Sequence, residues 1–137
     1  MEIDTLELDN LNKTSVQKIS NKQQIINDLL LIIEENKYFL NPECSIDSLA
    51  KKIETNRQYL SVIINDKFDS NFNQFINTYR IKEARKLLLD KEYDKYTIDA
   101  IAKLSGFKTK ATFNAAFKKI TGVTPSFFKK EHLQFTA

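Results

Sequence analysis

The feature that most constrains the fold is an internal repeat. The segment SIDSLAK, which begins at Ser45, recurs as TIDAIAK, which begins at Thr97, 52 residues later. The apolar residues that follow align at an offset of 53, as Leu60 with Phe113, Ile64 with Phe117 and Phe72 with Pro125. The one-residue difference falls in a turn, where insertions are tolerated. The chain is therefore expected to contain two copies of one small unit.

The second copy, within residues 96–128, has the pattern of a helix, a tight turn and a second helix. Thr97 is placed to cap the first helix, which Gly106 then breaks. Gly122 stands where the second helix ends, and Pro125 suits the start of another. The inner face of the second helix is predicted to comprise Phe113, Ala116, Phe117 and Ile120. Two short helices joined by a glycine-containing turn form a helix-turn-helix unit, whose second helix can enter a DNA major groove.

The first copy has the same pattern, and a longer helix joins the two copies. Ser45 is placed to cap its first helix, and Thr55, with Gln58 three residues later, has the spacing of a capping box at its second helix. The inward positions of the connecting helix are predicted to be Phe72, Phe75, Ile76, Tyr79, Ala84, Leu87 and Leu88. The expected segments are a linker or disordered tail at 1–20, a DNA-binding domain at 21–131, a first unit at 45–70, a connecting helix at 71–89, a second unit at 97–122 and a C-terminal tail at 132–137.

The composition favours an all-α protein. The 137 residues include two glycines, two prolines and no run of alternating β-branched residues. With a single cysteine, Cys44, no internal disulfide is possible, which fits a reducing cytoplasm. The sequence shows no metal-ligand cluster, no phosphate-binding glycine loop and no nucleophile paired with a histidine. We therefore predict no enzyme activity, no cofactor, no metal and no small-molecule site.

Charge is distributed unequally between the two units. Residues 106–130 contain six lysines and no acid, whereas residues 45–70 contain four basic and four acidic residues. A lysine-rich surface by itself is most often only a solvated face. On a helix-turn-helix unit, however, the same lysines favour a surface that faces DNA phosphates. The second unit is therefore the stronger electrostatic candidate for DNA binding.

The repeated units and two further segments resemble the DNA-binding domain of the AraC/XylS family of bacterial transcription regulators. The segments are YRIKEARKLLLD, at 79–90, and IAKLSGFKTKATFNAAFKKITGVTPSFF, at 101–128. The resemblance covers about residues 21–131 and implies a seven-helix bilobal fold, promoter binding that activates transcription, and RNA polymerase as a partner. The segment LLLDKEYDKYTIDAIA, at 87–102, is similar to the branch in which this domain ends a larger, often membrane-bound sensor protein. We therefore expect a cytoplasmic fragment of a longer chain with a sensor domain.

The chain departs from the family pattern at three positions. Many members carry arginine where this chain has Val62 and Ala115, so base contacts by that arginine have no counterpart in either unit. The usual serine or asparagine cap of the second recognition helix is Lys108. Thr109 is therefore expected to cap that helix.

The first unit offers base-reading side chains near the start of its second helix. The candidates on its exposed side are Asn56, Arg57, Gln58 and Ser61. Arginine can read guanine and glutamine can read adenine, each through two hydrogen bonds. Gln58 has an alternative structural role as the capping partner of Thr55. Arg80, on the connecting helix, can contact phosphate or brace the two lobes, and we favour bracing.

The second unit offers mostly phosphate-binding side chains. The outward candidates are Lys108, Thr109, Lys110, Thr112, Asn114 and Lys118. Asn114 is the candidate base reader, whereas Lys108 and Lys118 suit phosphates because a lone ammonium binds as a point charge. The leading hypothesis is a sequence-specific activator that inserts both recognition helices into successive major grooves of double-stranded DNA. The alternatives are a non-specific architectural protein and a protein-interaction domain that has lost DNA binding.

Overall fold

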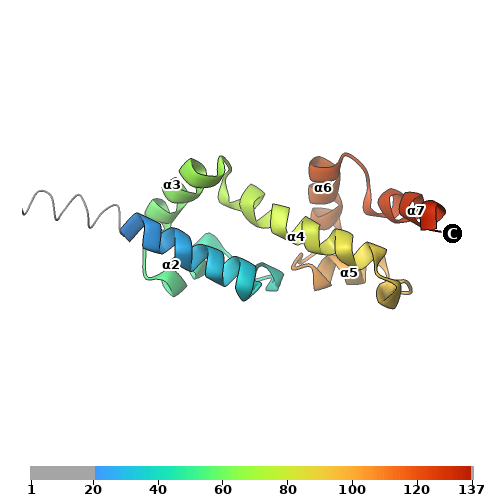
Figure 1. Ribbon diagram of the computed structural model, residues 1–137, viewed down its shortest axis with the longest axis horizontal. Coiled ribbons are helices and arrows are strands. Elements are labelled where there is room, and N and C mark those ends of the chain that lie inside the picture. The colour runs from blue at the N-terminus through green and yellow to red at the C-terminus, as the bar shows by residue number, and fades with distance from the viewer. Residues whose placement is uncertain (1–20, 137) are drawn as a thin grey trace, which may run out of the picture.

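The computed structural model describes residues 21–136, and every regular element in that range is a helix. A first helix at 21–30 continues as the π-helical turn η1 (Leu31–Glu35) and is followed by η2 (Tyr38–Leu40). The remaining elements are α2 (Ile46–Ile53), α3 (Arg57–Phe68), α4 (Phe72–Leu89), η3 (Lys91–Tyr93), α5 (Ile98–Leu104), α6 (Lys110–Thr121) and α7 (Pro125–Thr136). The predicted all-α class is thus confirmed, and the predicted tail at 1–20 lies outside the described residues (Figure 1).

Two separate hydrophobic cores divide the described residues into two lobes. The first lobe packs the helix at 21–35, η2, α2 and α3 against the first half of α4, where Phe75 and Ile76 are buried. The second lobe packs α5, α6 and α7 against the other half, where Ile81, Ala84 and Leu88 are buried. Figure 1 shows α4 as a continuous helix through both lobes. The bilobal architecture is therefore confirmed, and α4 is the structural link between the two units.

The helices of the two units have the same kind of N-terminal cap. Each of the four helices begins at a side-chain oxygen that accepts a hydrogen bond from the backbone N–H of the third helical residue. The donor and acceptor pairs are Ser48 N to Ser45 Oγ (3.0 Å), Tyr59 N to Asn56 Oδ1 (2.8 Å), Ala100 N to Thr97 Oγ1 (3.0 Å) and Thr112 N to Thr109 Oγ1 (3.1 Å). The predicted caps Ser45, Thr97 and Thr109 are confirmed.

The predicted cap at Thr55 is wrong, because Asn56 caps α3. The chain leaves α2 through Glu54 in the left-handed conformation (φ 63°). The Thr55 N–H then donates to the Ala50 carbonyl (2.9 Å) and closes the end of α2. Asn56 is the next residue and has the extended backbone that an N-cap requires. Gln58 consequently has no role in a capping box with Thr55.

Two burial predictions also need correction, as does one boundary. Ile120 is 43% exposed, because it extends beyond the second core, beside a cleft between α6 and the start of α4. Ile81, absent from the predicted inward set of the connecting helix, is only 1% exposed and belongs to the second core. Finally, α7 continues to Thr136, so it includes most of the segment 132–137 that the sequence predicts to be a C-terminal tail.

The junction between the lobes is built around Arg80 and Gly106. The Arg80 guanidinium donates from Nε to the Phe39 carbonyl (2.7 Å) and from an amino group to the Asn41 carbonyl (3.1 Å). The guanidinium also lies over the Phe107 ring of the second lobe, with 5.6 Å between the guanidinium carbon and the ring centroid. The predicted bracing role of Arg80 is therefore confirmed. Nearby, burial raises the pKa of the Cys44 thiol to about 11, so Cys44 is a protonated, packed loop residue at neutral pH.

Two structural features require glycine at position 106. Its φ is +99°, a conformation that side chains other than glycine rarely adopt. A Cβ at this position would also lie 2.3 Å from the Phe39 carbonyl oxygen and 2.8 Å from Arg80 Nε. The turn of the second unit is therefore docked closely against the first lobe, and a side chain at Gly106 would push the lobes apart.

Candidate nucleic-acid interface

The second helices of the two units occupy equivalent places in the fold. In the view of Figure 1, α3 and α6 both stand above α4, whereas α2 and α5 lie below it. Both α3 and α6 have 12 residues, and their first residues are 53 positions apart. The buried positions of the two helices match at this offset, as Leu60 with Phe113, Ile63 with Ala116 and Ile64 with Phe117. Any residue of α3 therefore has a defined counterpart in α6.

The register defines the outward face of each helix, opposite its buried positions. The outward face of α3 comprises Arg57, Gln58, Ser61, Val62 and Asn65, and that of α6 comprises Lys110, Ala111, Asn114, Ala115 and Lys118. All ten are exposed except Ser61 and Asn114, which are half-buried. Helices with an exposed polar face and an apolar face fixed in a core are suited to enter a major groove.

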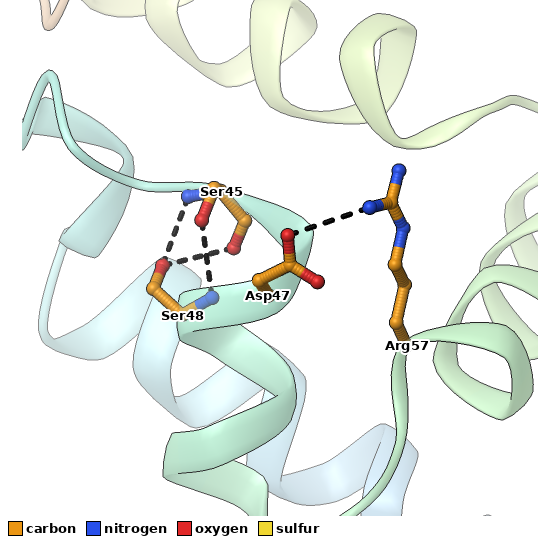
Figure 2. Close-up of polar contacts among 4 residues, drawn as sticks. All are labelled: Ser45, Asp47, Ser48 and Arg57. Atoms are coloured by element: carbon orange, nitrogen blue, oxygen red, sulfur yellow. Dashed lines mark hydrogen bonds and ion pairs between the residues drawn. The ribbon is translucent and has the colours of Figure 1, made fainter.

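In the first unit, Arg57 is held by a weak ion pair. Its guanidinium lies 3.4 Å from the Asp47 carboxylate, which belongs to the first turn of α2 (Figure 2). The two side chains are 66% and 63% exposed, and such pairs contribute about 0–1 kcal/mol. The pair therefore orients Arg57 near the start of α3 without preventing it from contacting DNA.

The other candidate side chains of the first unit differ in whether they already make hydrogen bonds within the protein. The Asn56 side-chain oxygen is engaged in capping α3. Asn65 donates from its amide nitrogen to the Ser61 carbonyl (2.9 Å), within the helix. Gln58 is exposed on the outward face, and the correction at Thr55 removes its competing structural role. Arg57 and Gln58 are therefore the two long side chains on the outward face of α3.

In the second unit, the two threonines serve the helix start. Thr109 Oγ1 accepts from the Thr112 N–H, the two hydroxyl oxygens are 2.8 Å apart, and Thr112 Oγ1 donates to the Thr109 carbonyl (2.9 Å). Lys108 lies 3.4 Å from the Glu43 carboxylate of the first lobe, again between highly exposed side chains. Lys110 and Lys118 are exposed on the outward face, and Asn114 is half-buried between them.

Two features of this surface were missed in the sequence. Asn65 occupies the position in α3 that Lys118 occupies in α6, and the sequence prediction does not include it among the outward residues. The sequence prediction includes Val62 only as a departure from a family pattern, whereas in the structure it is 55% exposed in the middle of the outward face. The offset of 53 between the two copies was the signal that could have identified both residues.

The described residues contain few features that would suggest another kind of site. Within residues 21–136 no group of three or more histidine, cysteine, aspartate or glutamate residues could hold a metal ion. No helix in this part of the chain is long and apolar enough to cross a membrane. A cleft of about 490 Å³ lies between α6 and the start of α4, lined partly by Asn71, Asn77 and Lys119.

Comparison with known proteins agrees with this geometry. A family model described as a helix-turn-helix domain matches residues 49–131. The probable transcription factor PqrA of Proteus vulgaris is 30% identical over 108 residues, which cover 79% of this chain and 85% of PqrA. YtdP of Bacillus subtilis, an uncharacterized HTH-type transcriptional regulator, is 29% identical over 65% of this chain, which spans only 11% of YtdP.

Solved structures share the fold. The C-terminal domain of AraT, a response regulator from Geobacillus stearothermophilus, matches with a TM-score of 0.64 and 26% identity, over 82% of each chain. The DNA-binding domain of AdpA in complex with a target DNA matches with a TM-score of 0.67 and 18% identity, over 79% of this chain and 91% of that one. An AraC-type regulator from Chromobacterium violaceum has a TM-score of 0.62 and 17% identity, over 85% of this chain and 95% of that one.

Proposed function

The chain belongs to the AraC-type family of helix-turn-helix DNA-binding transcription regulators, and we propose that it recognises a specific promoter sequence and activates transcription. In this proposal α3 and α6 enter successive major grooves on one face of double-stranded DNA. The observation that supports it is the match in register between α3 and α6 on one continuous connecting helix. A single chain thus presents two recognition helices, as a dimer of simpler repressors does.

The length of α4 supports binding across two grooves. With 18 residues it is about 27 Å long, at about 1.5 Å per residue. The two candidate recognition helices pack against its opposite halves. The length of α4 is therefore of the same order as one DNA turn, about 34 Å, which separates successive major-groove entries on one face of the duplex.

The two units are proposed to divide the work of recognition. Arg57 and Gln58 of the first unit read bases, while Lys110 and Lys118 of the second unit neutralise phosphates, assisted by Lys108. The charges favour this division, because residues 45–70 are neutral in sum whereas residues 106–130 contain six lysines and no acid. Asn114 is the base-reading candidate of the second unit, although its half-buried side chain presents less surface. Phosphate contacts supply affinity, and base contacts supply sequence discrimination.

The wider context of the chain is also part of the proposal. The chain spans 11% of YtdP and 30% of the Msm operon regulatory protein of Streptococcus mutans, to which it is 33% identical over 86 residues. We infer a longer cytoplasmic or membrane-bound regulator in which a sensor domain controls this DNA-binding domain, and RNA polymerase as the partner in activation. A reporter gene with the bound sequence upstream of a weak promoter should show increased expression. Decreased expression would indicate a repressor.

Selection of bound DNA from a random pool, followed by footprinting on the selected sequence, tests the proposal. We expect two short motifs with centres about 10 base pairs apart, both protected by one chain. A protected region shorter than one helical turn would contradict binding in two grooves. A featureless pool would instead indicate a non-specific architectural protein, and no retained DNA would indicate an interaction domain.

A further inference from the structure

Val62 is an unusual residue for the place that it occupies. It is 55% exposed in the middle of the outward face of α3, and it contributes to neither hydrophobic core of the described residues. A β-branched side chain loses rotamer freedom in a helix, so local helix stability does not favour valine at an exposed position. A single exposed aliphatic side chain is common on protein surfaces. Val62 differs from such residues because it lies on the face of α3 that would meet the base edges in a major groove.

The neighbour of Val62 along the same face is Gln58. The two residues are four positions apart, so their side chains lie next to each other, about 6 Å apart, on the helix surface. Successive base pairs are separated by about 3.4 Å along the DNA axis, so the two side chains can contact one base pair or closely spaced ones. Gln58 can pair with N6 and N7 of adenine, and the thymine opposite an adenine presents its 5-methyl group in the same groove.

We propose that Val62 is a specificity-determining residue that contacts the 5-methyl group of a thymine, within or beside the A·T pair read by Gln58. The inference rests on the proposed function, because it requires α3 to lie in a major groove. The methyl group is the one apolar feature of the base edges in that groove, and apolar side chains are its natural partners. Ala115, the counterpart of Val62 in α6, is exposed too but has a shorter side chain that reaches less far.

The test is replacement of thymine by uracil, one position at a time, in the selected duplex. Uracil keeps the base pair and the O4 acceptor and lacks only the 5-methyl group. If Val62 buries that methyl group, one uracil in the half-site of α3 should weaken binding of the unaltered protein by about fourfold, the value of one buried methylene. Equal binding to thymine and uracil at all positions of this half-site would overturn the proposal.

The variant Val62→Ala, tested on the thymine and uracil duplexes, completes a double-mutant cycle between this side chain and the methyl group. Its fold should be preserved, because the side chain is exposed and alanine is the better helix former. It should bind the thymine duplex about fourfold more weakly and should show no further loss on the uracil duplex. If the variant loses as much on uracil as the unaltered protein does, the two changes are independent and Val62 does not contact that methyl group.

Ile120→Ala is the matched control, since Ile120 is also a β-branched residue exposed on a recognition helix but lies beside the cleft near α4. It should retain the full fourfold sensitivity to uracil, and loss of that sensitivity would overturn the assignment to Val62. Failure of the inference differs from failure of the proposed function. In the first case the selected duplex still binds but does not distinguish thymine from uracil, whereas in the second no specific duplex is selected.

Discussion

The two helix-turn-helix units have the same backbone plan and different surfaces. Their helices start at equivalent caps, their recognition helices are equal in length, and their buried positions coincide at one offset. On the outward faces, Arg57, Gln58 and Val62 of the first unit stand where the second has Lys110, Ala111 and Ala115. Buried positions and caps therefore define the fold of each unit, and the outward positions are left available for different modes of DNA contact.

The turns of the two units differ for a structural reason. Glu54 and Gly106 are equivalent and both have positive φ, of 63° and 99°. Only Gly106 lies against the other lobe, where a Cβ would meet the Phe39 carbonyl and Arg80. The same turn therefore accepts a side chain in the first unit and excludes one in the second, because the second turn forms the junction.

The largest effect is expected from Gly106→Val. The substitution combines a strained φ for a β-branched residue with a clash against backbone, and it should lower the free energy of unfolding by about 3–5 kcal/mol. Chemical denaturation measures the change. Gly122→Ala is the control, because Gly122 also has positive φ but no atom lies within 4 Å of its Cβ position. Gly122→Ala should lower the free energy of unfolding by only ~1 kcal/mol. Equal decreases for the two variants would show that the close approach of Gly106 to Phe39 is unimportant.

Arg80→Met should give the next largest loss of stability, about 2–3 kcal/mol. It removes two hydrogen bonds from a charged donor to the carbonyls of Phe39 and Asn41. Methionine retains much of the aliphatic stem, so the loss reports mainly on the guanidinium. The thermal midpoint of Arg85→Met, a more exposed arginine on α4, should change much less. An unchanged thermal midpoint for Arg80→Met would show that Arg80 does not brace the two lobes.

Lys118→Ala should weaken binding to all DNA sequences by a similar factor. If Lys118 contacts one phosphate, the slope of log affinity against log salt should decrease in magnitude by about 0.9. Titrations at several salt concentrations measure the slope. Asn65→Ala, at the matching position of the first unit, should leave the slope unchanged. A changed base preference with an intact slope for Lys118→Ala would show that Lys118 reads bases.

Asp47→Asn is expected to have the smallest effect. Removing the carboxylate beside Arg57 frees the guanidinium and reduces repulsion of phosphates, so binding to random DNA should strengthen by about 0.5 kcal/mol or less. Asp99→Asn is the matched control, because Asp99 pairs with Lys103 within its own helix and not with a recognition helix. Weaker binding by Asp47→Asn would mean that the ion pair positions Arg57 for DNA.

Local chemistry made much of the fold predictable. The caps Ser45, Thr97 and Thr109 follow from residue type and spacing, and the repeat revealed both units. The helix period placed Ile120 inward, but the period does not show where the core ends. The capping role of Asn56 depended on how α2 terminates. The pairs Arg57–Asp47 and Lys108–Glu43, and the close approach of Gly106 to Phe39, join residues on different elements of the fold, so no local sequence pattern could indicate them.

The most direct test of the division between the units is a titration of Arg57→Ala on the selected duplex and on random duplex. The variant should lose about 1–3 kcal/mol of binding free energy on the selected duplex, which is the value of a good bidentate base contact. It should lose much less binding free energy on random DNA. Asn114→Ala should lose less than Arg57→Ala on the selected site. Equal losses on the two duplexes for Arg57→Ala would show that this arginine is another phosphate contact, and would contradict the assignment of sequence discrimination to the first unit.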